Sequence, residues 1–129
     1  MQAQSAERML PALGVTRIVI GLGLLVSPVG LGRGLGIDAG TSRRVAWMAR
    51  VAGGREIALG IGTLQAWRRG DPADGWVIAQ AVSDGVDAVA FTASAARGHV
   101  GPLRGYGLAA FAASGAISEV LAARALRRR

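Results

Sequence analysis

The sequence contains no cysteine, no lysine and a single histidine, and only 5% of its 129 residues are aromatic. Without cysteine the chain has no disulfide scaffold, no thiol redox chemistry, no haem attached through thiols and no cysteine-based zinc site. A lone His99 rules out a His-rich metal site. The few aromatic residues supply no stacking platform for nucleic-acid bases. We therefore expect no metal, no cofactor and no nucleic-acid partner.

Because lysine is absent, all 15 basic residues are arginine, and with 8 acidic residues they give a net charge of +7. Basic proteins often bind nucleic acid, but these arginines are scattered singly or in pairs along most of the chain. The exception is the C-terminal end, where the basic tail 125–129 follows Arg124. We interpret this tail as a signal for membrane topology, with anionic lipid as its alternative partner.

Charged residues are also scarce, at 18% against about 25% in an average soluble domain. Hydrophobic residues reach 51% and the mean hydropathy is +0.37. The 20 glycines follow no Gly-X-Y period, which excludes collagen, and the apolar content excludes disorder. These values indicate a helical membrane protein, and an alanine-rich soluble four-helix bundle is the alternative.

Four apolar segments predict helices over about 11–26, 44–67, 75–96 and 103–124, within one domain covering residues 1–129. Each segment is roughly as long as the bilayer core requires, and the alanine and glycine content disfavours strands. Trp47, Trp67 and Trp76 fall near segment ends, as aromatic residues at a membrane interface do. The predicted fold is all-α, a transmembrane up-down four-helix bundle.

The connectors carry turn and capping signals. Ser27-Pro28 should stop the first helix, and the glycine-rich stretch 30–40 should contain no stable helix. Thr41 or Ser42 is expected to cap the second helix and Asp74 the third. The N-terminal residues do not resemble a cleaved signal. More arginines lie on the side of the two termini, so we expect a multi-pass protein of the plasma membrane with both termini in the cytoplasm.

Charged residues interrupt every apolar segment. If the helices span a bilayer, these residues should face the bundle interior and pair there. This predicts a buried network of the following residues: Arg17, Arg50, Arg55, Glu56, Asp84, Asp87 and Glu119.

Depths measured along the predicted helices, at about 1.5 Å per residue from the side of the termini, suggest partners within this network. Arg55 and Asp87 both lie at about 18 Å, so we expect them to pair. Arg17, at about 9 Å, should meet Glu119 at about 7 Å or Asp84 at about 13 Å. Glu56, at about 16 Å, has no assigned partner.

The network has a structural and a functional interpretation. In the structural one, the arginine–carboxylate contacts fix the register of the helices. In the functional one, an excess carboxylate takes part in proton transfer or acid/base chemistry, and Glu56, Asp84 and Asp87 are the candidate catalytic residues.

One internal similarity is visible between residues 13–25 and residues 52–64. Its matched pairs are Gly14 with Gly53, Ile18 with Ile57, Gly21 with Gly60, Gly23 with Gly62 and Leu25 with Leu64. The similarity indicates either an old duplication of one helix or the shared composition of glycine-rich membrane helices.

The segments Arg50-Val-Ala-Gly-Gly-Arg-Glu-Ile-Ala-Leu-Gly-Ile-Gly and Asp84-Gly-Val-Asp-Ala resemble a family of small actinobacterial four-helix integral membrane proteins with a domain of unknown function. The resemblance implies a fold and a location but no catalytic residue. Function is therefore open between an accessory or scaffolding membrane protein, a proton-coupled carrier of small molecules, and a membrane enzyme acting on a lipophilic substrate. A scaffold would contact a second copy of the chain or another membrane protein.

Overall fold

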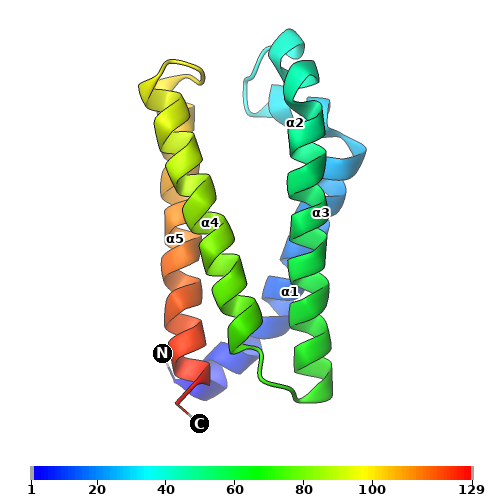
Figure 1. Ribbon diagram of the computed structural model, residues 1–129, viewed down its shortest axis with the longest axis vertical. Coiled ribbons are helices and arrows are strands. Elements are labelled where there is room, and N and C mark those ends of the chain that lie inside the picture. Colours follow the sequence, from blue (N-terminus) through cyan, green and yellow to red (C-terminus); the bar gives the residue numbers. More distant parts are fainter. Residues whose placement is uncertain (1, 129) are drawn as a thin grey trace. The chain divides into compact units, whose positions relative to one another are not determined.

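The computed structural model describes residues 2–128, which form five α-helices and no strand (Figure 1). The helices are α1 (Ala3–Val26), α2 (Pro28–Gly34), α3 (Ala39–Arg69), α4 (Asp74–Ala96) and α5 (Pro102–Leu126). The predicted all-α class is confirmed. The chain divides into two compact units, which we call the α1–α3 unit (residues 8–71) and the α4–α5 unit (residues 72–128 with the first turn of α1).

Helix α1 begins at Ala3, so the predicted start at Pro11 is wrong. A proline inside a helix removes one backbone hydrogen bond and crowds the preceding turn, so proline is more common at the start of a helix. For this reason the helix was predicted to begin at Pro11. The turns before it are held by the burial of Ala6 and Leu10, which are almost fully excluded from solvent. Helix α1 ends at Val26 before Ser27-Pro28, as predicted.

The glycine-rich linker contains a short helix, which the sequence did not predict. Pro28 occupies the first turn of α2, where its fixed φ angle suits a helix and its missing N–H costs nothing. The chain then leaves the helical conformation at Gly36, whose φ of 77° is readily adopted by glycine. Gly32 lies against the Ser42 side chain, so α2 packs on the start of α3.

The predicted helix caps are displaced by a few residues. Asp38, not Thr41 or Ser42, caps α3, and its carboxylate accepts a hydrogen bond from the Thr41 backbone N–H at 3.0 Å. Helix α4 starts at Asp74 itself, with Ala73 in the capping position. The sequence offered several capping side chains in a row, and the backbone uses the first of them for α3.

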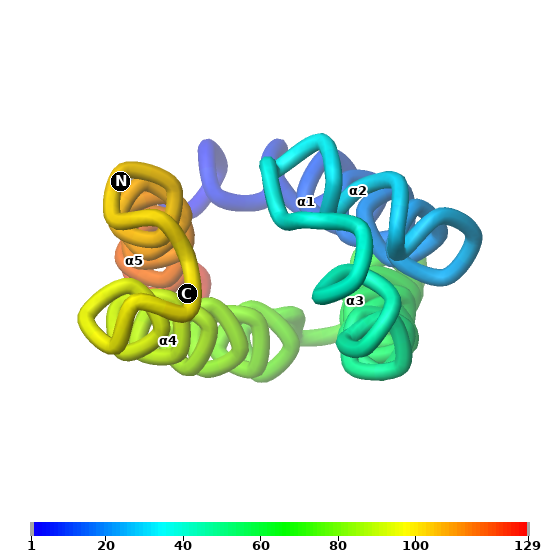
Figure 2. The backbone as a smooth tube through the Cα atoms, turned by 90° about the horizontal axis from the view of Figure 1, so that it is seen from above, coloured from blue at the N-terminus to red at the C-terminus, as the bar shows by residue number. Residues whose placement is uncertain are grey.

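Helices α4 and α5 run antiparallel and side by side in both ribbon and tube views (Figures 1 and 2). The turn between them includes Gly98 at a φ of 74°. Near this turn Gly105 lies directly against Ala95, where a Cβ on the glycine would come within 2.6 Å of the alanine Cβ. At the other end of the pair, Arg127 Nε donates a hydrogen bond to Asp74 Oδ2 at 2.7 Å.

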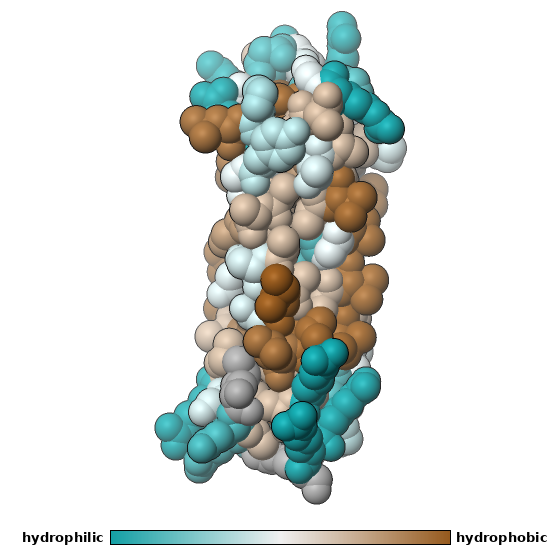
Figure 3. Space-filling model, turned by 90° about the vertical axis from the view of Figure 1, so that its left-hand side faces the viewer, coloured by the Kyte–Doolittle hydropathy of each residue, from teal (hydrophilic) through white to brown (hydrophobic). Residues whose placement is uncertain are grey.

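Small and polar residues are buried, whereas large apolar residues are exposed. The buried set is dominated by alanine and also contains charged and polar side chains such as Arg17, Glu56 and Gln80. The exposed set includes Phe111 at 74%, Val89 at 70% and Trp47 at 64% exposure. Figure 3, which looks onto the side of α4 and α5, shows hydrophobic residues gathered between two hydrophilic ends.

Helices α1 and α5 are long and apolar enough to cross a bilayer, by length and composition alone. Among the helices of residues 2–128, these two alone meet that condition. Helix α3 carries Arg50, Arg55 and Glu56 in its central part, and α4 carries Asp84 and Asp87.

Candidate functional site

A buried ion pair joins α1 to α3. Arg17 Nη1 lies 2.6 Å from Glu56 Oε2, and the two residues are only 8% and 4% exposed. The second carboxylate oxygen, Oε1, accepts hydrogen bonds from Arg55 Nε at 3.3 Å and Arg55 Nη2 at 3.2 Å. One carboxylate therefore binds two guanidinium groups, one from each helix.

Glycines on both helices bring the two backbones into contact around this pair. An added Cβ on Gly21 would lie 2.6 Å from the Gly53 carbonyl oxygen, and one on Gly60 would lie 2.6 Å from the Gly14 carbonyl oxygen. Such distances leave no room for any side chain. Each of Arg17 and Glu56 has a glycine three residues before it and another four residues after it, so the charged side chains lie between two points of backbone contact.

These contacts connect the two similar segments that the sequence contains. Gly14 and Gly21 of the first segment match Gly53 and Gly60 of the second, yet Gly14 packs on Gly60 and Gly21 on Gly53. The two segments therefore pair antiparallel with reciprocal contacts. Arg17 and Glu56 occupy the same position in the two segments.

The sequence-based depths missed the Arg17–Glu56 pair because they placed the start of α1 at Pro11. Counted on the observed helices, Arg17 lies about 21 Å along α1 from Ala3, and Glu56 lies about 20 Å along α3 from Arg69. The two residues therefore lie at the same height along the paired helices. Their equal position in the two similar segments was the signal that could have revealed the pair.

In the α4–α5 unit, the carboxylate of Asp84 packs against a further glycine. The Asp84 carboxylate lies directly against Gly115, in the space that a Cβ on residue 115 would fill. Glu119, one turn further along α5, is only 3% exposed. Gln80 is fully buried, and within residues 2–128 the buried Ser83 hydroxyl makes no hydrogen bond.

The structure thus places the predicted network residues in two groups. The first contains Arg17, Arg55 and Glu56. The second lies on α4 and α5, where Asp84 contacts Gly115 and Glu119 follows Gly115 by one helical turn. Asp87 is half-buried in α4. Arg50 is exposed, which differs from its predicted place in the buried network. It lies on α3 six residues before Glu56, so about 600° of helical rotation turns it about 120° away from the buried face.

The predicted pairs of Arg55 with Asp87, and of Arg17 with Asp84 or Glu119, join residues of different units. They stay predictions. Within the part of the chain that the structure describes, no group of three or more His, Asp or Glu residues is arranged to hold a metal ion.

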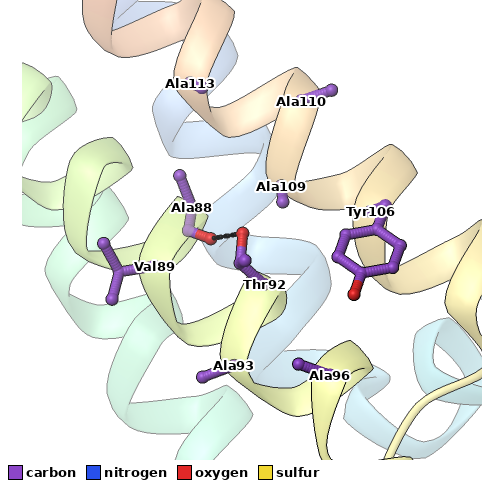
Figure 4. A pocket seen from close by; sticks show the side chains of 9 residues that line it. All are labelled: Ala88, Val89, Thr92, Ala93, Ala96, Tyr106, Ala109, Ala110 and Ala113. Atoms are coloured by element: carbon purple, nitrogen blue, oxygen red, sulfur yellow. Dashed lines mark hydrogen bonds between the residues drawn. The ribbon is translucent and has the colours of Figure 1, made fainter.

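A groove of about 590 Å³ lies between α4 and α5 on the half nearest the Gly98 turn. Figure 4 shows its lining, which consists of Ala88, Val89, Thr92, Ala93, Ala96, Tyr106, Ala109, Ala110 and Ala113. The Thr92 hydroxyl donates a hydrogen bond to the Ala88 carbonyl oxygen at 2.8 Å, drawn as a dashed line (Figure 4). The groove is therefore apolar apart from the Tyr106 hydroxyl, and no carboxylate lines it.

Two carboxylates outside the apolar segments have shifted acidities. The hydrogen bond from Arg127 lowers the pKa of Asp74 below its ordinary value of 3.8, and hydrogen bonds from Thr41 lower the pKa of Asp38 in the same direction. Both groups therefore remain ionised at neutral pH.

Comparison of the chain with protein-family models, with curated proteins and with solved structures finds no match.

Proposed function

We propose that this protein is an integral membrane bundle in which α1, α3, α4 and α5 cross the plasma membrane, and that it acts as an accessory or scaffolding protein through helix contacts. The distribution of side chains supports this proposal. Large apolar residues on the outside and small or polar residues inside are the reverse of a soluble domain, and they suit a hydrocarbon solvent.

The single observation that carries the proposal is the Arg17–Glu56 pair within the glycine contacts of α1 and α3. An ionisable residue inside a bilayer is costly unless it faces the bundle interior and is paired. Glu56 is buried against two guanidinium groups, which offsets much of the cost of placing α3 in hydrocarbon. This pairing explains how α3 would cross a membrane although it is less apolar than α1 and α5.

The lining of the groove between α4 and α5 favours a scaffold over a carrier or an enzyme. A carrier or enzyme that used Glu56, Asp84 or Asp87 would need a cavity that reaches one of these carboxylates. The groove between α4 and α5 does not reach them. A structural role for the charges therefore accounts for more of the observed geometry than a catalytic one.

The arginine distribution supports an orientation for the proposed bundle. With four spans, both termini and the connection between α3 and α4 lie on one side of the membrane. This side carries Arg8, Arg68, Arg69, Arg124 and the arginines of the basic tail 125–129. Fewer arginines lie on the other side, so the proposal places both termini in the cytoplasm.

Two experiments test the proposal. After alkaline carbonate extraction of membranes, the protein should stay in the pellet and dissolve only in detergent; recovery as a soluble monomer would exclude membrane integration.

The second experiment uses the absence of cysteine, because a single introduced thiol is then the only reactive one in the chain. Phe111→Cys, on an exposed position of α5, should form a cross-linked complex in native membranes if α5 contacts a second copy or another membrane protein. Val19→Cys tests α1 in the same way. Cross-linking from neither position, together with transport or turnover that depends on Glu56, would favour the carrier or enzyme instead.

A further inference from the structure

The groove between α4 and α5 ends beside a basic surface. On α4 its lining ends at Ala96, and the next residue is the exposed Arg97. On α5 its lining starts at Tyr106, two residues after the exposed Arg104. The exposed His99 lies in the turn between them. Residues 88–118 include no acidic residue, so the sequence of this half of the helical pair is basic.

Two further features of the same end favour an anion. Helix α5 starts after Gly101 and no side chain caps it, and the N-terminus of a helix attracts negative charge. Tyr106 lines the groove and is 48% exposed. A tyrosine of this kind, with an apolar ring and a polar hydroxyl, is typical of the headgroup level of a membrane.

The rest of the groove suits a hydrocarbon chain. Its lining covers Ala88 to Ala96 on α4, a length of about 12 Å along the helix axis. The alanines keep the groove open, and the Thr92 hydroxyl is hydrogen-bonded to its own helix. Apart from the Tyr106 hydroxyl, the walls therefore offer no polar group that would bind water. Val89, at 70% exposure, stands on the rim of the groove.

We infer that this groove binds one acyl chain of an anionic phospholipid, with the lipid phosphate held by Arg97 and Arg104 at the end of the groove. The inference rests on the proposed membrane location. It adds a defined lipid site, on the side of the membrane that holds the turn between α4 and α5.

The test uses the full-length protein in detergent, with phosphatidylglycerol and phosphatidylcholine of identical acyl chains as probes. Retained lipid is counted by native mass spectrometry. One arginine near an anionic headgroup contributes about a fivefold preference, so the two together predict retention of phosphatidylglycerol about 30-fold over phosphatidylcholine. Arg97→Gln should reduce this preference about fivefold, and the double variant with Arg104→Gln should abolish it. Arg43→Gln, which changes an exposed arginine of the α1–α3 unit, is the matched control and should change nothing.

A second pair of variants tests the groove itself. Ala93→Phe fills the groove and should reduce retention of both lipids, whereas Ala90→Phe, on the exposed surface of the same helix, should not. Melting temperature and molecular mass of each variant are measured in the same samples, so that a folding defect is recognised; if Ala93→Phe fails to fold, the arginine variants still decide.

Several outcomes would overturn the inference. These are equal retention of the two lipids by the wild type, a preference that survives loss of both arginines or disappears in Arg43→Gln, and a folded Ala93→Phe variant that retains both lipids. A change in oligomeric mass in Ala93→Phe without loss of lipid would assign the groove to a second copy of the chain. Carbonate extraction separates the two proposals, because a protein that stays in the membrane pellet but shows no lipid preference contradicts only the lipid site.

Discussion

Glu56 is the residue whose removal should damage the α1–α3 unit most, because its carboxylate binds both Arg17 and Arg55. Breaking a buried ion pair by removing one partner typically costs 3–5 kcal/mol of the free energy of unfolding, since the remaining charge stays in a medium of low polarity. With Arg17 and Glu56 less than a tenth exposed, this range applies here. Glu56→Ala removes two pairs and Arg17→Ala only one, so we expect Glu56→Ala to be the more damaging variant.

The double variant Arg17→Ala/Glu56→Ala should lose less than the sum of the two single losses, because neither charge of the pair remains. The exchange Arg17→Glu/Glu56→Arg tests the geometry further. Since the two positions are equivalent in the paired segments, the exchanged charges can meet again, but the new arginine at position 56 adjoins Arg55. Recovery should therefore be partial, and it should increase when Arg55→Gln is added.

The assay is unfolding of the purified protein in mixed micelles by increasing SDS, followed by circular dichroism, with Tm in detergent as a second readout. Arg50→Ala, which changes an exposed arginine of the same helix, is the matched control and should stay within about 0.5 kcal/mol of the wild type. Strictly additive losses of Arg17→Ala and Glu56→Ala would refute the reasoning, because two residues that share an interaction cannot behave independently.

Three further predictions concern the glycine contacts, acidity and orientation. Gly60→Ala should destabilise the protein by about 1–3 kcal/mol in the SDS assay, because its Cβ would meet the Gly14 carbonyl oxygen, whereas Gly54→Ala has open space and should stabilise it by up to about 1 kcal/mol; equal effects would contradict the backbone contact. The lowered pKa of Asp74 means that its contact with Arg127 contributes fully above the unfolded value near 3.8 and is lost as the pH falls through the lower folded pKa. Comparing Asp74→Asn with the wild type should give a difference of no more than about 1 kcal/mol at pH 7 that vanishes below that window, and a difference that persists in strong acid would contradict this assignment. Reporters fused to the two ends should both be active on the cytoplasmic side; activity of either on the outside would reverse the proposed orientation.

The long helices were predictable because their ends carry strong local signals. Ser27-Pro28 ends α1 and the glycine at position 70 ends α3, where its φ of 70° closes the last turn. The start of α1 was not predictable from such signals, because Pro11 is a local break in the pattern and the burial of Ala6 and Leu10 that outweighs it depends on distant parts of the chain. Helix α2 was missed for the same reason, since glycine-rich sequence has low helix propensity and only packing on α3 holds it.

The sequence predicted which residues belong to the candidate site better than it predicted the contacts between them. The rule that charges in hydrocarbon face inward identified Arg17 and Glu56 as buried. It could not choose their partners, because an error of eight residues at the start of α1 displaced Arg17 by about 12 Å along the helix. A side chain's partner depends on such lengths, whereas its burial depends only on its helical face. For Arg50 the burial itself was predicted wrongly. Its position along the helix suggested a buried side chain, but Arg50 lies on an exposed face of α3.

The reciprocal contacts of α1 and α3 carry a consequence for how such a pair can arise. Two identical helices that associate antiparallel form a twofold symmetric dimer, and any residue near the axis then faces its own copy. A dimer of that kind would bring arginine against arginine or glutamate against glutamate, and like charges in an apolar medium repel. Arg17 can face Glu56 at the equivalent position because the two helices differ in sequence, and within one covalent chain the two positions are free to diverge. Linking the two helices thus permits a neutral pair at the axis that no homodimer of a single helix can contain.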